Sequence, residues 1–156
     1  MHAQLPISNV SRTIPHAYIE GMKAILQTRY GDPEQVLSLG EIDAPTPGDD
    51  EVLVRVRATS VNTPDWIGVL GVPYVLRAAS GLFGPVSAVR GSDLAGVVQA
   101  VGAKVTELSP GDEVFGSVWT GAFRRGAQGT YCEQTVAPAS HLAKKPKGLG
   151  FEEAAG

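Results

Sequence analysis

The sequence is poor in the residues on which several classes of protein depend. Among its 156 residues there is one cysteine, Cys132, so no disulfide can form within the chain, and we expect a reducing, cytoplasmic setting. No apolar run approaches the roughly 18 residues of a transmembrane helix, and the N-terminus lacks the charged and then apolar order of a signal peptide. The net charge of −3 provides no basic surface for nucleic acid. We therefore expect neither a membrane nor a nucleic acid as partner.

Residues for metal binding and nucleophilic catalysis are equally scarce. A tetrahedral zinc site takes several cysteine or histidine ligands, and beside Cys132 the chain has three histidines, with no CxxC or HxxxH spacing. There is no GxSxG elbow, and the nearest candidate for a dinucleotide-binding GxGxxG, Gly148-Leu149-Gly150, has Glu153 in place of the third glycine. The residues predict no zinc site and no nucleotide-binding βαβ unit.

Turn residues between short alternating segments are abundant. The 19 glycines and 11 prolines favour many short strands over long helices. The clearest strand is 51–61, where valines alternate with leucine and arginine. Further strands are predicted at 22–30, 36–42, 91–102, 114–119, 130–137 and 140–145. Strands about ten residues apart are typical of a barrel or a sandwich, so the predicted fold class is mostly β.

The remaining segments are predicted to be irregular or only briefly helical. Residues 1–21 show no useful periodicity and are interpreted as an irregular extension. Residues 68–90 are interpreted as a long apolar loop that covers another part of the protein. Pro64 favours a first helical turn, and 150–155 begin like a helix. Gly96 within a strand predicts a bulge or a close backbone approach.

Asn62, Thr63 and Asp65 form the best polar cluster, directly after the strand 51–61. A loop at a strand's end can present such side chains to a ligand while the sheet fixes their position. The alternative is that Asn62 and Asp65 only bond the adjoining backbone as a helix cap, and composition alone favours this alternative. Trp66 and Tyr74 follow as aromatic candidates for a substrate pocket, although such residues more often anchor a core or a loop.

The order of four segments gives a much more specific signal. These are MKAILQTRYGDPEQVL, EVLVRVRATSVNTPDW, RGSDLAGVVQAVGAKVTELSPGDEVFG and FEEAA. Over residues 22–156 the chain resembles the N-terminal GroES-like domain of the medium-chain dehydrogenase/reductase superfamily, in its zinc-independent quinone oxidoreductase-like branch. The resemblance implies a GroES-like, partly open β-barrel with short helices.

The resemblance also implies which positions carry the chemistry. Asn62 stands where the zinc enzymes have a cysteine ligand, and Gly91-Ser92-Asp93 stands where they have Gly-His-Glu, so no zinc is expected. Asn62 and Asp65 match an Asn-x-x-Asp motif whose asparagine lies beside the nicotinamide, so both are cofactor-binding candidates. The tyrosine that usually follows this motif is replaced by Ile67, and Tyr74 lies one position out of register with a second family tyrosine.

By this resemblance the chain is the substrate-side part of a reductase that transfers hydride from NADPH, or NADH, to a quinone or enone. Superfamily members continue into a Rossmann domain that holds the nucleotide, and residues 1–156 contain none, so we expect the chain alone to be inactive. Surfaces that would pack on that domain should be apolar, which favours a homo-oligomer. The alternative is a GroES-like module that binds or assembles without catalysis.

Overall fold

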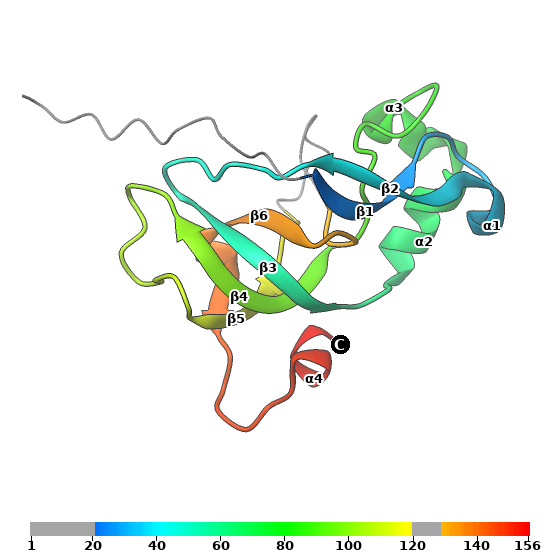
Figure 1. Ribbon diagram of the computed structural model, residues 1–156. Helices are drawn as coiled ribbons and strands as arrows, with labels where there is room; N and C mark the ends of the chain where they lie inside the picture. Colours follow the sequence, from blue (N-terminus) through cyan, green and yellow to red (C-terminus); the bar gives the residue numbers. More distant parts are fainter. Residues whose placement is uncertain (1–20, 120–128) are drawn as a thin grey trace, which may run out of the picture.

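Two antiparallel sheets make up most of the structure, a computed structural model that describes residues 21–119 and 129–156 (Figure 1). The smaller sheet pairs β1 (Gly21–Gln27) with β2 (Leu37–Asp43). The larger has the order β6-β3-β4-β5-β7, formed by β3 (Glu51–Thr59), β4 (Asp93–Val101), β5 (Glu113–Ser117), β6 (Gln134–Pro138) and β7 (Leu142–Lys144). The predicted mostly β fold is confirmed, and these sheets curve without closing into a barrel.

The core lies on one face of the larger sheet, where the alternation of β3 places it. Val52 and Val54 are both fully buried, whereas Arg55, between Val54 and Val56, is exposed. The buried cluster comprises Val52, Val54, Leu94, Val98, Leu108 and Val114. Branched side chains on neighbouring strands thus remove a continuous apolar surface from water, which is the main contribution to stability.

Gly96 allows β3 and β4 to approach closely. A Cβ atom added at Gly96 would lie 2.2 Å from the carbonyl oxygen of Arg55, a separation that real side chains do not reach. The pairing of β3 with β4 also shifts register between Val56 and Ala58. The predicted bulge or close approach at this glycine is confirmed.

The small sheet is attached to the large one by backbone hydrogen bonds from β1. The amide of Ile25 donates to the carbonyl oxygen of Tyr131 at 2.8 Å, and that of Gln27 donates to Ala88 at 2.7 Å. The amide of Glu133 donates to the carbonyl oxygen of Lys23 at 3.1 Å. The hairpin therefore brings the end of β1 to the segments that precede β4 and β6.

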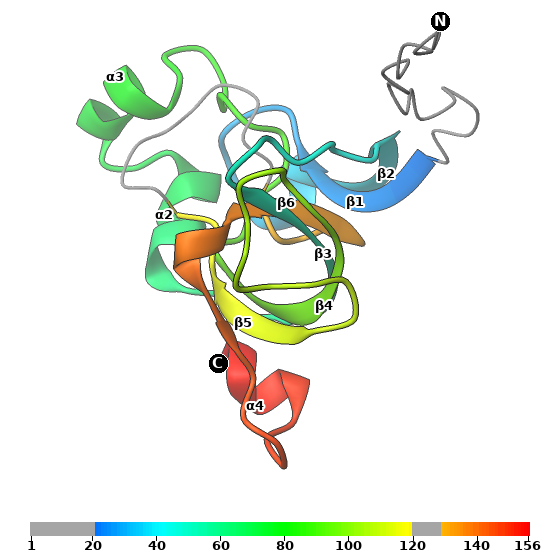
Figure 2. The ribbon, with the colours of Figure 1, turned by 90° about the vertical axis from the view of Figure 1, so that its left-hand side faces the viewer.

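Short helices gather at one end of the molecule (Figures 1 and 2). They are α1 (Pro33–Val36), α2 (Thr63–Leu70), η1 (Tyr74–Leu76) and α3 (Arg77–Ser80), while η2 (Ala139–His141) and α4 (Phe151–Ala155) follow the larger sheet's strands. No helix of the described residues is long and apolar enough to cross a membrane. The helical start predicted at Pro64 and the helix predicted near the C-terminus are confirmed.

The interpretation of 68–90 as a loop without regular elements is wrong in its first half. α2 continues to Leu70, where Gly71 in the left-handed region (φ 66°) ends it and donates to the carbonyl of Ile67 at 2.8 Å. η1 and α3 then follow. Each is about one turn long, which is too short for a helical period to appear in the sequence. β6 begins at Gln134, later than predicted, and residues 1–20 of the interpreted N-terminal extension fall outside the described residues.

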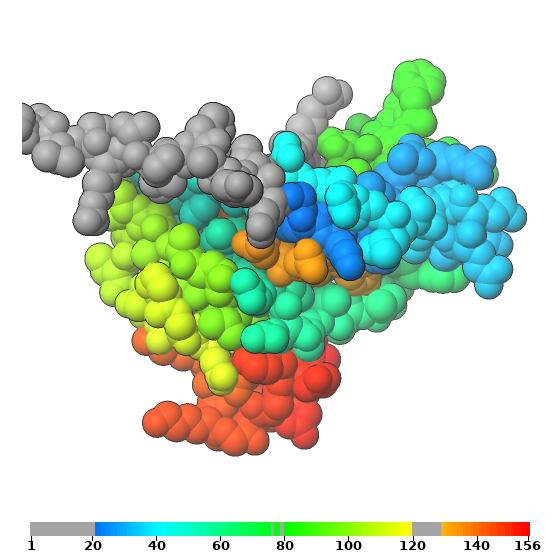
Figure 3. All heavy atoms as spheres, in the orientation of Figure 1, coloured from blue at the N-terminus to red at the C-terminus, as the bar shows by residue number. Residues whose placement is uncertain are grey.

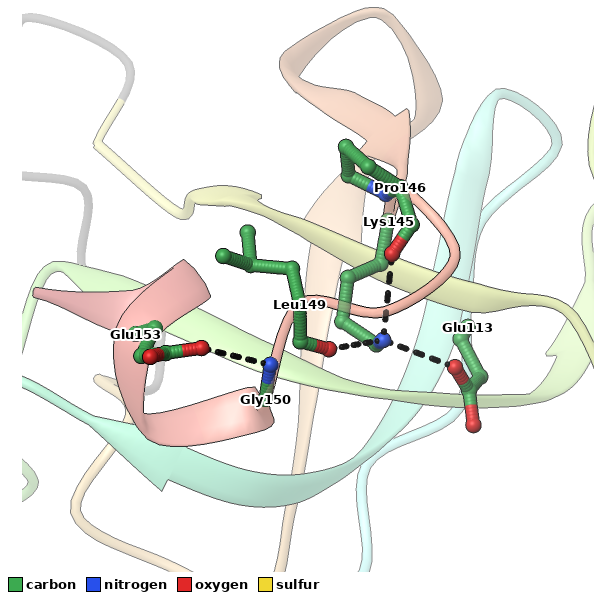
Figure 4. A network of polar contacts seen from close by, with 6 residues as sticks. All are labelled: Glu113, Lys145, Pro146, Leu149, Gly150 and Glu153. Atoms are coloured by element: carbon green, nitrogen blue, oxygen red, sulfur yellow. Dashed lines mark hydrogen bonds and ion pairs between the residues drawn. The ribbon is translucent and has the colours of Figure 1, made fainter.

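A buried lysine holds α4 against the larger sheet (Figure 4). The side chain of Lys145 is 5% exposed, and its ammonium lies 3.0 Å from a carboxylate oxygen of Glu113. The same group donates to the carbonyl oxygen of Leu149 at 2.5 Å and lies 5.1 Å from the ring centroid of Phe151. These contacts close the turn between β7 and α4, and in the space-filling view the C-terminal residues pack beneath the sheet (Figure 3).

Candidate functional site

A polar cluster forms where β3 ends, α2 begins and β4 starts. Asn62 is the residue before the first turn of α2, with extended backbone angles, and Asp65 is the third residue of the helix. Ser92 and Asp93 reach the same place from the start of β4, because β3 and β4 are antiparallel neighbours with Thr59 opposite Leu94. Two segments about 30 residues apart in the sequence thus meet where β3 ends and β4 begins.

Asp65 is buried, with 6% of its surface exposed, and both of its oxygens are bonded. One accepts from the backbone amide of Asn62 at 2.9 Å, and the other accepts from the hydroxyl of Ser92 at 3.1 Å. The carboxylate also lies in the first turn of α2, where the helix dipole favours negative charge. The bond to the amide of Asn62 is the one that the helix-cap interpretation predicts, but the bond to Ser92 reaches the residue before β4, so Asp65 does more than cap its own helix.

The side chain of Asn62 has a different role from the one that a cap requires. Its amide nitrogen donates to the hydroxyl of Ser60 at 3.1 Å and forms a short hydrogen bond with the carboxylate of Asp93. Its carbonyl oxygen has no partner among the described residues and is not among their buried unsatisfied atoms. The half-buried side chain is thus held at its nitrogen end while its oxygen is left open.

Further polar groups surround Asn62, Asp65 and Asp93 and hold the backbone beside them. The hydroxyl of Thr59 donates to the backbone carbonyl of Asp93 at 2.7 Å and lies 2.7 Å from the hydroxyl of Thr130. The phenol of Tyr131 donates to the carbonyl of Ser60 at 3.2 Å. Burial raises the pKa of Tyr131, and the charges of Asp65 and the neighbouring aspartate raise it further, so its phenolic oxygen stays protonated at neutral pH.

Arg90, like Tyr131, lies beside the cluster but was not identified from the sequence. Its Nε donates to the side-chain oxygen of Gln27 at 2.5 Å, and its Nη2 is the one buried side-chain nitrogen or oxygen of the described residues without a hydrogen-bond partner. Burial lowers the pKa of the guanidinium, and the nearby Tyr30 and Asp65 oppose that shift. Only the β1 hairpin brings Gln27 here, and no local pattern marks Arg90 or Tyr131.

The two aromatic candidates lie outside this cluster. Trp66 is on α2, next to Asp65, and is 52% exposed, with its amide bonded to the carbonyl of Asn62 at 3.2 Å. Tyr74 begins η1, is 71% exposed, and lies over the guanidinium of Arg77. The structure therefore brings Asn62 and Asp65 together and leaves the two aromatic residues on the surface beyond them.

The cluster offers few of the cysteine and histidine ligands that zinc usually takes. Within the part of the chain that the structure describes, no three histidine, cysteine or carboxylate side chains are placed so as to hold a metal. At the cluster itself only Asp65 and Asp93 carry charge, and both are engaged by Asn62. Amide and hydroxyl groups predominate, and these groups orient a neutral ligand by hydrogen bonds.

Comparison with known proteins places these residues in a family. The profile of the alcohol dehydrogenase GroES-like domain matches residues 48–147. A 2-methylene-furan-3-one reductase of Solanum lycopersicum is 35% identical over 135 residues, which are 86% of this chain and 33% of the relative. A chloroplastic NADPH-dependent alkenal/one oxidoreductase of Arabidopsis thaliana is 34% identical over 140 residues, which are 86% of this chain and 34% of the relative.

Solved structures show the same fold. The quinone oxidoreductase of Coxiella burnetii superposes with a TM-score of 0.72 at 27% identity, covering 87% of this chain and 40% of that one. The chain spans about a third of the length of these curated relatives.

Proposed function

Because the chain belongs to the alcohol dehydrogenase GroES-like domain family, we propose that it is the substrate-side domain of an NADPH-dependent, zinc-independent reductase of quinones or conjugated carbonyl compounds. The names of its relatives support this class, since they include an alkenal/one oxidoreductase, a furanone reductase and a quinone oxidoreductase. NADPH is preferred to NADH because one of these relatives is named for it. The domain extends over residues 22–156.

The observation that carries the proposal is the fixed and half-open amide of Asn62. Its nitrogen end is held by Asp93 and Ser60, and its free carbonyl oxygen can accept a hydrogen bond from the carboxamide of a nicotinamide. Because Asp93 and Asp65 hold both the side chain and the backbone amide of Asn62, little entropy is lost when a ligand binds. Such preorganisation is what a reacting ring needs to be placed accurately.

The other residues of the cluster support this placement. Asp65 is a positioning residue, since its buried oxygens are used by Ser92 and Asn62. Tyr131 keeps its proton on the phenolic oxygen and holds the carbonyl of Ser60. With no metal to polarise it, a substrate carbonyl would be oriented by hydrogen bonds, and bound NADPH would supply the hydride.

The test compares the 156-residue chain with a fusion in which the nucleotide-binding domain of a related quinone oxidoreductase follows Gly156. The chain alone should neither bind NADPH saturably nor oxidise it with a quinone acceptor, because the pyrophosphate is held by the glycine-rich turn of the second domain. The fusion should oxidise NADPH. In the fusion, Asn62→Ala should lower kcat more than it weakens NADPH binding, whereas Lys104→Ala, which removes an exposed ion pair with Asp49, should change neither.

Two results would contradict the proposed division of work between the domains and the proposed role of Asn62. One is an isolated chain that binds NADPH tightly or oxidises it, since the domains would then divide their work differently. The other is a folded, active fusion in which Asn62→Ala leaves kcat unchanged. A stoichiometric, tightly held zinc in either protein would contradict the zinc-independent assignment.

A further inference from the structure

Arg77, at the start of α3, is held over two aromatic rings. Its guanidinium carbon lies 4.5 Å from the ring centroid of Tyr30 and 4.5 Å from that of Tyr74. Its Nε donates to the carbonyl oxygen of Gly71 at 2.8 Å, at the end of α2. Stacking uses the faces of the planar guanidinium and leaves its N–H groups, which lie in the plane, available for hydrogen bonds.

The groups that hold Arg77 are themselves fixed. The phenol of Tyr30 bonds the backbone carbonyls of Ser80 and Gly81, each at 2.9 Å. Gly71 adopts left-handed angles, and a Cβ atom there would lie 2.5 Å from the ring of Tyr30 and 2.9 Å from the Nε of Arg77. The guanidinium is therefore built into the junction of α2, η1 and α3, with little freedom to turn.

The outer end of this guanidinium is unused. Within residues 21–119 and 129–156, its two terminal nitrogens have no hydrogen-bond partner, and the ion pairs found there are Lys104–Asp49, Lys144–Asp112 and Lys145–Glu113. Neither nitrogen is among the buried unsatisfied atoms of that part of the chain, so both are open to solvent. A fixed arginine with its charge unpaired and its terminal donors exposed is preorganised for a planar anion.

Large apolar side chains are exposed on both sides of Arg77 in the sequence. Val72, Tyr74 and Val75 precede it, and Leu82 and Phe83 follow it, with Phe83 96% exposed. The segment around α3 also projects from the rest of the molecule (Figure 3). Exposed apolar residues that flank Arg77 in the chain can supply apolar contacts to a ligand that its guanidinium binds.

We propose that Arg77 binds the carboxylate of an amphiphilic organic anion whose apolar part lies on the exposed side chains of η1 and the segment after α3. A carboxylate matches the paired donors of a guanidinium, and an attached chain gains from apolar contacts that the free anion lacks. The inference rests on the proposed function in one respect, since the anion is taken to be the substrate of the proposed reductase. The substrate would then be a conjugated carbonyl compound that also carries a carboxylate.

The binding step is tested on the 156-residue chain without NADPH, by NMR of the Arg77 Nε–H signal. Hexanoate should shift this signal saturably, and the neutral hexanamide should not. Acetate should bind at least threefold more weakly than hexanoate, because it lacks the apolar chain. Equal shifts with hexanamide, no shift with hexanoate, or equal affinities for acetate and hexanoate would each overturn the proposal.

Variants distinguish binding of the anion at Arg77 from a general attraction to positively charged side chains. Arg77→Gln should weaken hexanoate binding at least tenfold, whereas Arg57→Gln, which removes an exposed arginine of β3, should leave it unchanged. Arg77→Lys keeps the charge but loses the planar donors, and should bind at least threefold more weakly than the original chain. Equal weakening by the Arg57 variant would overturn the proposal. If Arg77→Gln fails to fold, the titration of the original chain still decides. Because no hydride transfer is measured, failure here is distinct from failure of the proposed reductase.

Discussion

Replacing Lys145 should show how strongly one buried ammonium fastens α4 to the sheet. Lys145→Met keeps most of the apolar stem and removes the charged end, with its bond to the carbonyl of Leu149, its contact with the Phe151 ring and its ion pair with Glu113. A hydrogen bond from a charged group is worth about 1.5 to 3 kcal/mol net. The ring contact adds about 0.5 to 1 kcal/mol. The ion pair adds at most about 1 kcal/mol, because Glu113 is half exposed to screening water.

Lys145→Met should therefore lower the free energy of unfolding in urea by about 2 to 5 kcal/mol. Two matched variants separate the contributions. Glu113→Gln should cost at most about 1 kcal/mol, since the bond to Leu149 remains. Lys144→Met removes the neighbouring lysine, which is exposed and paired only with Asp112, and should cost no more.

Hydrogen exchange gives an independent measurement of the same effect. The amide of Ala154 donates to the carbonyl of Gly150, the residue before α4, and it should exchange faster in Lys145→Met and at the original rate in Lys144→Met. The reasoning is refuted if the two lysine variants lose equal stability, or if Glu113→Gln costs as much as Lys145→Met. In the second case the exposed ion pair, and not the buried carbonyl, would fasten the helix.

Two further changes test the packing of the sheet and the chemistry of the thiol. Gly96→Ala should lower the free energy of unfolding by about 1 to 3 kcal/mol or more, because the new methyl group would collide with the carbonyl of Arg55, and urea unfolding measures this. Burial raises the pKa of the Cys132 thiol to about 11, so its rate of alkylation by iodoacetamide should rise about tenfold per pH unit from pH 7 to 10. A plateau of that rate near pH 8.5, the range of an ordinary thiol, would show that Cys132 is more exposed than the structure indicates.

Some of the fold follows from local sequence alone. The alternation in 51–61 separated the valines of β3 from its leucine and arginines, because successive residues of a strand point to opposite faces and the period is visible within a few positions. The position of Gly96 predicted a close approach for a similar reason, since only a residue without a side chain suits such a point. The pair Asn62 and Asp65 was identified as one cluster because three positions of a first helical turn lie close together.

The tertiary structure alone decided what that cluster does. The bond from Asn62 to Asp93 joins residues 31 positions apart, and the bond from Tyr131 to Ser60 joins residues 71 positions apart. Whether a short polar side chain caps its own helix or bonds a neighbouring strand depends on which strand pairs beside it, and no local period records that choice. The same holds for Arg77, whose two rings come from segments more than 40 positions apart, so the orientation of its free donors exists only in the folded chain.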